Sequence, residues 1–147
     1  MSKPQHIALV GFANAGKSTF FNTITDSKQK TGNWSGVTVS SSQKQCNLLG
    51  KDTLVTDLPG ISSLTAKAQQ SKDLSITQSF LNNEHIDYLI NIVDATQLKR
   101  QLYLTTQLLE LGLPMCVVLN KSDRKEASEI DHKVLAKELG CPVIAVN

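Results

Sequence analysis

The stretch GFANAGKS, Gly11 to Ser18, matches the pattern G-x-x-x-x-G-K-[ST] and decides the fold. It follows the apolar run Ile7–Val10 and opens a helical pattern at Lys17, so it connects a predicted strand to a predicted helix. Backbone N–H groups of such a turn can surround phosphate oxygens, and the positive helix end strengthens the attraction. A purely structural glycine-rich turn is the alternative. The residues predicted to hold a nucleotide's phosphates are Gly11, Asn14, Ala15, Gly16, Lys17, Ser18 and Thr19.

Strand-like and helix-like segments alternate along the chain, which favours a parallel sheet with helices on both faces. Thr38–Cys46 is polar and alternating, as an edge strand would be. We predict a three-layer α/β fold of the P-loop NTPase type, with a six-stranded, mostly parallel sheet and one antiparallel edge strand. The predicted strands are Ile7–Val10, Thr38–Cys46, Thr53–Thr56, Tyr88–Val93, Met115–Leu119 and Val143–Val146, and the predicted helices are Lys17–Thr25, Asp73–Asn82, Leu98–Leu111 and Asp131–Leu139.

Composition and charge argue against several classes of protein. The chain has 147 residues and is 40% hydrophobic, which suits one compact domain over residues 1–147. The net charge of +2 is dispersed and only 5% of residues are aromatic, so we expect no nucleic-acid partner. The three cysteines show no C-x-x-C spacing, which argues against a disulfide framework or zinc site. No apolar run reaches the length of a signal peptide or membrane helix, so we expect a soluble chain.

The segment VTDLPG places Asp57 at the end of a β-branched strand, where a carboxylate can hold hydrated Mg²⁺. Gly60 lacks a Cβ and can bring its N–H close to a terminal phosphate. Thr38, in the earlier segment GVTV, is expected to bind Mg²⁺ together with Ser18 and Asp57. Each of these segments is also common in purely structural turns and strands. The nucleotide-binding residues predicted in them are Gly36, Val37, Thr38, Asp57, Leu58, Pro59 and Gly60.

A third motif, NKSD, follows a buried strand and contains Asn120, Lys121 and Asp123. Guanine presents two adjacent donors to a carboxylate, whereas adenine would leave the Asp123 carboxylate unpaired. Asn120 can tie this loop to the phosphate-binding loop, and the stem of Lys121 can cover the face of the base. NKxD alone is frequent in surface loops, but here it follows the other motifs in the order of a guanine-nucleotide-binding domain. We therefore predict GTP and GDP as ligands, Mg²⁺ as cofactor and a small-GTPase-like fold.

The residue after Gly60 raises a question about hydrolysis. Ras-like enzymes carry there the glutamine that orients the attacking water, whereas this chain has Ile61, whose side chain has no hydrogen-bonding atom. Either another group positions the water, or the chain binds nucleotide with negligible turnover.

Four further segments resemble the N-terminal GTPase domain of the bacterial ferrous iron transport protein B (FeoB) family. The resemblance runs from Ile7 to Ile144, and GNWxGVTV with VDAxxLxRxLYLxxQLLELGxP is specific to that family among GTPases. The segments are GNWSGVTV (Gly32–Val39), DLPGISSLT (Asp57–Thr65), INIVDATQLKRQLYLTTQLLELGLP (Ile90–Pro114) and LGCPVI (Leu139–Ile144).

The resemblance implies slow, Mg²⁺-dependent and K⁺-stimulated GTP hydrolysis that regulates ferrous iron uptake across the bacterial inner membrane. In cation-activated GTPases similar to FeoB, a phosphate-loop asparagine and main-chain carbonyls of the first switch hold K⁺. Asn14 matches that asparagine, and Gly32 and Trp34 match the carbonyl donors. A fixed cation there stabilises charge that develops between the phosphates. The residues expected to act in catalysis are Lys17, Thr38, Gly60 and Asn14.

The resemblance also implies a location and partners. In the family this domain precedes a helical subdomain and a polytopic membrane domain, so we expect a cytoplasmic part of an inner-membrane protein that partners its own membrane-spanning part. We expect the iron substrate to bind elsewhere. The family's fifth guanine-binding segment is expected just after Val146, which suggests that this chain is a fragment.

Three features depart from the family pattern. Phe12 and Ala13 replace the Asn-Pro of the usual GNPNxGK loop, and Ser62 replaces a tyrosine. NKSD is the generic GTPase form where many FeoB proteins have NMxD. An Era-type ribosome-assembly GTPase shares the motifs and remains an alternative, as does a regulatory module with negligible turnover.

Overall fold

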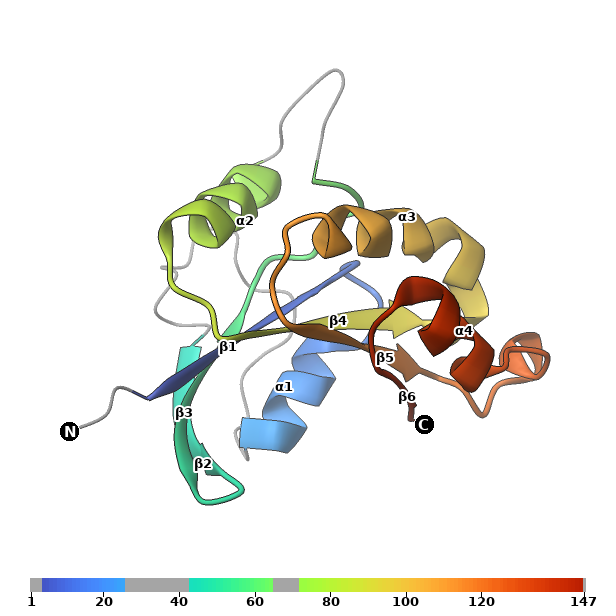
Figure 1. Ribbon diagram of the computed structural model, residues 1–147, viewed down its shortest axis with the longest axis horizontal. Helices are drawn as coiled ribbons and strands as arrows, with labels where there is room; N and C mark the ends of the chain where they lie inside the picture. The colour runs from blue at the N-terminus through green and yellow to red at the C-terminus, as the bar shows by residue number, and fades with distance from the viewer. Residues whose placement is uncertain (1–3, 26–42, 65–71, 147) are drawn as a thin grey trace.

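The computed structural model describes residues 4–25, 43–64 and 72–146, which form a six-stranded sheet in the order β2-β3-β1-β4-β5-β6 with helices on both faces (Figure 1). Among the strands of the described residues only β2 and β3 pair antiparallel, and the predicted fold class is confirmed. The strands are β1 (Gln5–Gly11), β2 (Gln43–Leu48), β3 (Lys51–Asp57), β4 (Tyr88–Asp94), β5 (Met115–Asn120) and β6 (Val143–Ala145). The helices are α1 (Lys17–Thr25), α2 (Lys72–Asn83), η2 (Ala95–Gln97), α3 (Leu98–Leu109), η3 (Lys125–Ala127) and α4 (His132–Leu139).

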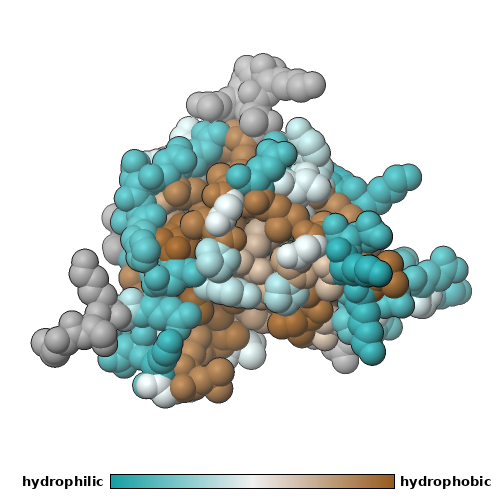
Figure 2. Space-filling model, viewed as in Figure 1, coloured by the Kyte–Doolittle hydropathy of each residue, from teal (hydrophilic) through white to brown (hydrophobic). Residues whose placement is uncertain are grey.

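Two apolar layers flank the sheet because successive side chains of a strand point to opposite faces. On one face, Ile7 and Leu9 of β1 pack with Phe21 of α1. On the other face, Ala8 and Val10 belong to a larger cluster that includes residues of α2, α3 and α4. Figure 1 shows α1 on one side of the sheet and α2 and α3 on the other. Figure 2 shows hydrophobic residues across the middle of one face of the molecule and hydrophilic residues around them.

The β2–β3 hairpin confirms the antiparallel edge and changes its boundaries. We predicted the edge strand over Thr38–Cys46, whereas the described strand covers Gln43–Leu48, and the start of the predicted range lies outside the described residues. The strand continues to Leu48 because the turn is tight. Leu49 and Gly50 both adopt positive φ, 52° and 83°, and such a two-residue turn matches the twist of a hairpin.

Helix ends follow local capping chemistry. Asp131 accepts hydrogen bonds from the N–H groups of Lys133 and Val134 and thereby caps α4. Gly140 ends α4 at a φ of 75°, directly after the predicted end of the helix at Leu139. α3 was predicted to end at Leu111 but ends two residues earlier, because the chain turns towards Gly112, whose φ is 76°.

A buried polar network fixes α3 against the centre of the sheet. Asn91 of β4 donates to the Val10 carbonyl at 3.1 Å and accepts from the Thr105 hydroxyl of α3 at 2.5 Å. These side chains are fully or almost fully buried, where an unpaired polar group would be costly. The network therefore sets the position of α3 relative to the strand that leads into the phosphate-binding loop.

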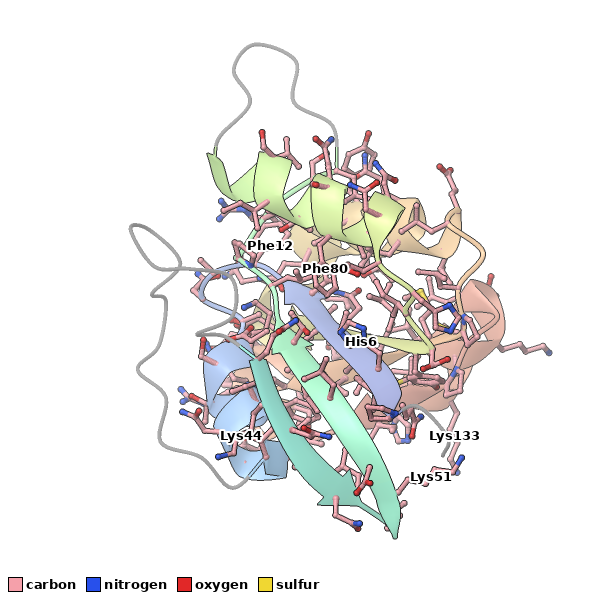
Figure 3. The ribbon with its side chains drawn as sticks, turned by 90° about the vertical axis from the view of Figure 1, so that its left-hand side faces the viewer. His6, Phe12, Lys44, Lys51, Phe80 and Lys133 are labelled. Atoms are coloured by element: carbon pink, nitrogen blue, oxygen red, sulfur yellow. The ribbon has the colours of Figure 1, made fainter. Side chains whose placement is uncertain are left out.

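His6 and His85, far apart in the sequence, both contact Asp87 near the start of β1. Asp87 accepts from the His6 N–H at 2.8 Å and contacts the His85 ring at 2.8 Å. The His6 ring stands edge-on to Phe80 of α2 with centroids 5.4 Å apart (Figure 3). This cluster holds α2 against the start of β1. No helix in the described part of the chain is long and apolar enough to cross a membrane.

Candidate functional site

The candidate site lies where β1, β3, β4 and β5 end, because the carboxyl ends of parallel strands meet at one edge of the sheet. The predicted motifs follow β1, β3 and β5 directly. The predicted residues Gly32, Trp34, Gly36, Val37 and Thr38 lie outside the described residues, so their roles stay predictions.

The centre of the site is an ion pair between the phosphate-binding loop and β3. Lys17 Nζ lies 2.5 Å from Asp57 Oδ1, and both side chains are almost completely buried. The Ser18 hydroxyl donates to the other carboxylate oxygen at 3.1 Å. The structure thus brings together three residues that the sequence assigned to phosphate and Mg²⁺ binding. A hydroxyl and a carboxylate oxygen this close are a donor set that suits Mg²⁺.

The DLPG segment is held against the phosphate-binding loop by its backbone. A Cβ added at Gly60 would lie 2.4 Å from Ala13 Cα, so only glycine fits at this distance. The next residue, Ile61, donates its N–H to the Gly11 carbonyl at 3.0 Å, and Leu58 donates to Leu9 at 3.1 Å. The two loops therefore form one surface, and Gly60 faces the loop that would hold the phosphates.

Ile61 is an anchor of the hydrophobic core. Its side chain is only 6% exposed and belongs to the cluster that includes Val10, Leu58 and Leu104. A polar side chain that orients water would have to face the nucleotide. The side chain at position 61 faces the core instead, which accounts for the absence of a glutamine there.

Replacing Ile61 with alanine is expected to lower the free energy of unfolding by about 2–5 kcal/mol, the usual cost of removing a buried aliphatic side chain. Turnover by the folded fraction should change only a few-fold, because the side chain offers no group to the reaction. Urea unfolding and single-turnover rates measure the two effects. The control is Val134→Ala, at an exposed position in α4, which should leave stability almost unchanged. A large catalytic loss in stably folded Ile61→Ala protein would contradict this interpretation.

The NKSD loop contacts the phosphate-binding loop as predicted. Asn120 donates from Nδ2 to the Ala15 carbonyl at 3.0 Å. A Cβ added at Gly16, whose φ is 90°, would lie 2.2 Å from that same nitrogen. Gly16 is therefore required both for its backbone conformation and for the approach of Asn120.

Lys121 has a partner that the sequence analysis missed. Its ammonium lies 3.1 Å from Asp94 Oδ2 at the end of β4 and 3.4 Å from the Asn14 carbonyl. Strand register places Asp94 directly beside Asn120. Burial raises the pKa of Asp94, but hydrogen bonds from Thr96 and Lys121 outweigh it and hold the pKa below its usual value. The sequence did carry a signal for this partner, because Asp94 is an acidic residue at the end of a strand, as Asp57 is.

Asp123, the residue predicted to read guanine, is exposed on the same loop. Ser122 beside it donates from both its N–H and its hydroxyl to the Val146 carbonyl, at 3.1 and 2.6 Å. Val146 in turn donates to Leu119 at 2.8 Å. The segment after β6 therefore supports the loop that would bind the base.

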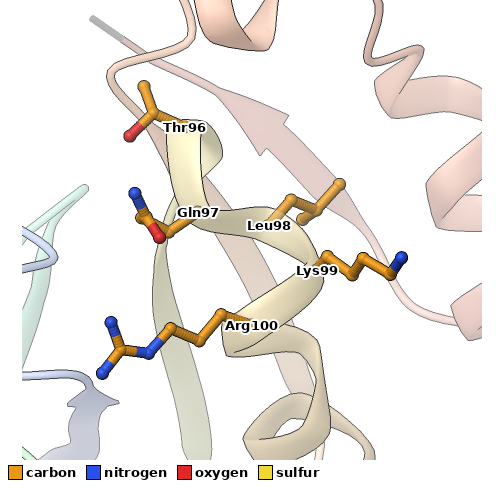
Figure 4. Close-up of a pocket in the computed structure, with 5 residues that line it drawn as sticks. All are labelled: Thr96, Gln97, Leu98, Lys99 and Arg100. Carbon is orange, nitrogen blue, oxygen red and sulfur yellow. The ribbon is translucent and has the colours of Figure 1, made fainter.

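Phe12 and Arg100 form a contact between the phosphate-binding loop and α3. The Arg100 guanidinium carbon lies 5.9 Å from the centre of the Phe12 ring, within range of a cation–π interaction. A cavity of about 400 Å³ is lined by Arg100 and the four residues before it. Figure 4 shows Arg100 and Gln97 on one side of this segment and Leu98 and Lys99 on the other. Phe12, which departs from the usual family loop, thus packs against a residue of the family pattern.

The fold and the site define a P-loop GTPase, with a phosphate-binding loop, a D-x-x-G segment and an N-K-x-D loop at one edge of the sheet. Residues 5–147 match the family described as ferrous iron transport protein B. The chain belongs to this FeoB family, which removes the Era-type alternative.

Relatives of known sequence and structure agree with the assignment to the FeoB family. The chain is 45% identical over 141 residues to the Fe(2+) transporter FeoB of Escherichia coli K12, covering 94% of this chain and 18% of that protein. The FeoB G-domain of Methanococcus jannaschii superposes with a TM-score of 0.81 at 39% identity, covering 99% of this chain and 87% of that one. The cytosolic domain of L. pneumophila FeoB superposes with a TM-score of 0.83 at 41% identity, covering 97% of this chain and 62% of that one. NFeoB of S. thermophilus, bound to GDP·AlF4⁻ and K⁺, superposes with a TM-score of 0.79 at 39% identity, covering 97% of this chain and 55% of that one.

Proposed function

We propose that this chain binds GTP and GDP with Mg²⁺ and hydrolyses GTP slowly, with stimulation by K⁺. The observation that carries the proposal is the convergence of Lys17, Ser18 and Asp57 beside a glycine that touches the phosphate-binding loop. Its relative from S. thermophilus binds GDP·AlF4⁻ and K⁺, which supports both the reaction and the cation.

The Lys17–Asp57 pair indicates how the site responds to nucleotide. Lys17 would reach phosphates held by the loop, and Asp57 would accept from the water shell of Mg²⁺. When nucleotide and metal bind, both side chains exchange one charged partner for another, so neither buried charge is left unpaired. Bound Mg²⁺ would neutralise charge that develops on the phosphates. Gly60 N–H would then help to hold the terminal phosphate or the attacking water.

Base recognition is proposed for the NKSD loop. Asp123 would accept both guanine donors, and Lys121, held by Asp94, would cover the face of the base. Val146 keeps the loop in place through Ser122. The proposed nucleotide site therefore includes residues from the ends of four strands.

We propose that K⁺ bound at Asn14 substitutes for part of the catalytic machinery that this chain lacks. GTP turnover is then expected to be about tenfold faster in KCl than in NaCl of equal concentration, because a positioned cation stabilises charge in the transition state. Asn14 is exposed on the loop, so replacing it with alanine should abolish the difference without unfolding the protein. Single-turnover chromatography of GTP and GDP measures both rates. Equal rates in the two salts would refute the cation proposal.

A nucleotide-binding module with negligible turnover is the second candidate, favoured by the inward packing of Ile61. The same chromatography separates the candidates. GDP formation no faster than in buffer alone would favour the binding module.

The wider role follows from family membership. We propose that nucleotide binding and hydrolysis regulate ferrous iron uptake through a membrane-spanning part of the same protein, with this domain on the cytoplasmic side. The chain spans 18% of the length of the curated relatives it matches. Iron uptake in a FeoB-deficient bacterium, complemented with full-length protein carrying Asp57→Ala, tests this role, and undiminished uptake would refute it.

A further inference from the structure

The segment that follows Gly60 is held by a glutamine from α3. Gln107 Oε1 accepts from the Leu64 N–H at 2.7 Å and from the Ser63 hydroxyl at 3.1 Å. One carbonyl oxygen thus uses both acceptor positions on two successive residues. All three residues are partly buried, so water competes only weakly for these bonds.

A second glutamine holds the same segment from α2. Gln78 donates from Nε2 to the Leu64 carbonyl at 2.5 Å. Leu64 therefore has its backbone N–H bound by one helix and its backbone C=O bound by another. α2 and α3 lie on the same face of the sheet (Figure 1). We call Gln78 and Gln107 the glutamine clamp.

The clamp is connected to the phosphate-binding loop by a short stretch of chain. At its start, Gly60 touches Ala13 and the Ile61 N–H is bound to Gly11. At its end, the clamp holds Ser63 and Leu64. Only Ser62 lies between the two fixed points, so a displacement of Leu64 is transmitted to the backbone of Gly60 with little chain to absorb it.

We propose that Gln107 and Gln78 are positioning residues that hold the Gly60 N–H where it acts on the terminal phosphate. This inference rests on the proposed hydrolysis of GTP. The side chains do not reach the nucleotide; they act through the backbone of Ser63 and Leu64 and then through Gly60. Loss of the clamp lowers the fraction of molecules in which Gly60 is correctly placed, and GDP binding is spared because GDP lacks the terminal phosphate.

Leu64 is bound by the oxygen of one amide and the nitrogen of the other, which gives the proposal a signature. Gln107 acts on Leu64 and Ser63 as an acceptor, so a glutamate there keeps an oxygen in place. Gln78 acts as a donor, so a glutamate there would face the Leu64 carbonyl with a second acceptor. Substitution by glutamate therefore keeps the bond to Leu64 at position 107 and loses it at position 78, whereas methionine loses it at both.

The test measures kcat and KM for GTP, and the Kd for a fluorescent GDP analogue, in the purified protein. We expect Gln107→Met and Gln78→Met each to lower kcat about 5- to 10-fold, the factor expected for losing one or two hydrogen bonds. Gln107→Glu should keep a higher kcat than Gln107→Met, and Gln78→Glu should fall at least as far as Gln78→Met. The Kd for GDP should change less than about twofold in all four variants, and thermal unfolding identifies any variant that fails to fold.

A second measurement does not depend on turnover. Amide hydrogen exchange at Leu64 should be faster in Gln107→Met than in the parent or in Gln107→Glu. Ser63→Ala removes the hydroxyl that donates to Gln107 and leaves the Leu64 N–H bond in place, so it should have a smaller effect on kcat than Gln107→Met. Unchanged exchange, equal kcat in Gln107→Met and Gln107→Glu, or a parallel loss of GDP affinity would each overturn the proposal. A parent protein that exchanges as expected but does not hydrolyse GTP would instead overturn the proposed hydrolysis, and the positioning role with it.

Discussion

Replacing Asp57 with alanine is expected to lower Mg²⁺-dependent GTP turnover about 100-fold or more and to destabilise the protein as well. The catalytic loss follows because the carboxylate that would hold the Mg²⁺ shell is gone. The loss of stability follows because Lys17, only 5% exposed, would keep a buried charge without its partner at 2.5 Å. Removing one member of a buried pair usually costs about 3–5 kcal/mol. Single-turnover rates at several Mg²⁺ concentrations and urea unfolding measure the two losses.

Asp57→Asn separates the two effects. The amide oxygen can still accept from Lys17, so stability should recover in part, whereas the neutral amide cannot replace the carboxylate in Mg²⁺ binding. The exposed acidic residue Glu126 in η3 provides a control, because Glu126→Gln removes the same charge away from the ion pair. Turnover in Asp57→Asn close to that of the parent would show that the carboxylate does not hold the metal.

Replacing Asp123 with asparagine is expected to weaken GTP and GDP binding about 100-fold or more and to create a preference for xanthine nucleotides. The carboxylate of Asp123 would accept from N1–H and the 2-amino group of guanine, whereas an amide offers one acceptor and one donor. Xanthine presents N1–H and a 2-oxo group, which match that amide. A site that leaves buried polar groups unpaired rejects a ligand by large factors. Competition between guanine and xanthine nucleotides for a fluorescent analogue gives both affinities.

The stability of Asp123→Asn should equal that of the parent, because the side chain is exposed. Asp94→Asn is the informative comparison. It weakens the hold on Lys121 and should reduce affinity for guanine and xanthine nucleotides alike, since the lysine stem contacts only the face of the base. If Asp123→Asn lowered the affinity for guanine and xanthine nucleotides equally, the proposed recognition of guanine by Asp123 would be wrong.

Much of the fold could be predicted because its signals are local. The apolar run before the phosphate-binding loop, the glycine that ends α4 and the alternation of strands and helices each depend on neighbouring residues. The ends of α3 and β2 were predicted less accurately. Turns that need positive φ at Leu49 and Gly112 decide those boundaries, and a leucine gives no local signal for such a conformation.

The sequence by itself determined the class of fold, the edge of the sheet that carries the site and the residue types of the three motifs, because regular periods and short motifs are properties of adjacent residues. Only the tertiary structure decided that Ile61 packs inward, that Asp94 holds Lys121 and that two helices bind Leu64. Those contacts join residues far apart in the chain. Strand order, register and helix position bring such residues together, and none of these can be read from local spacing.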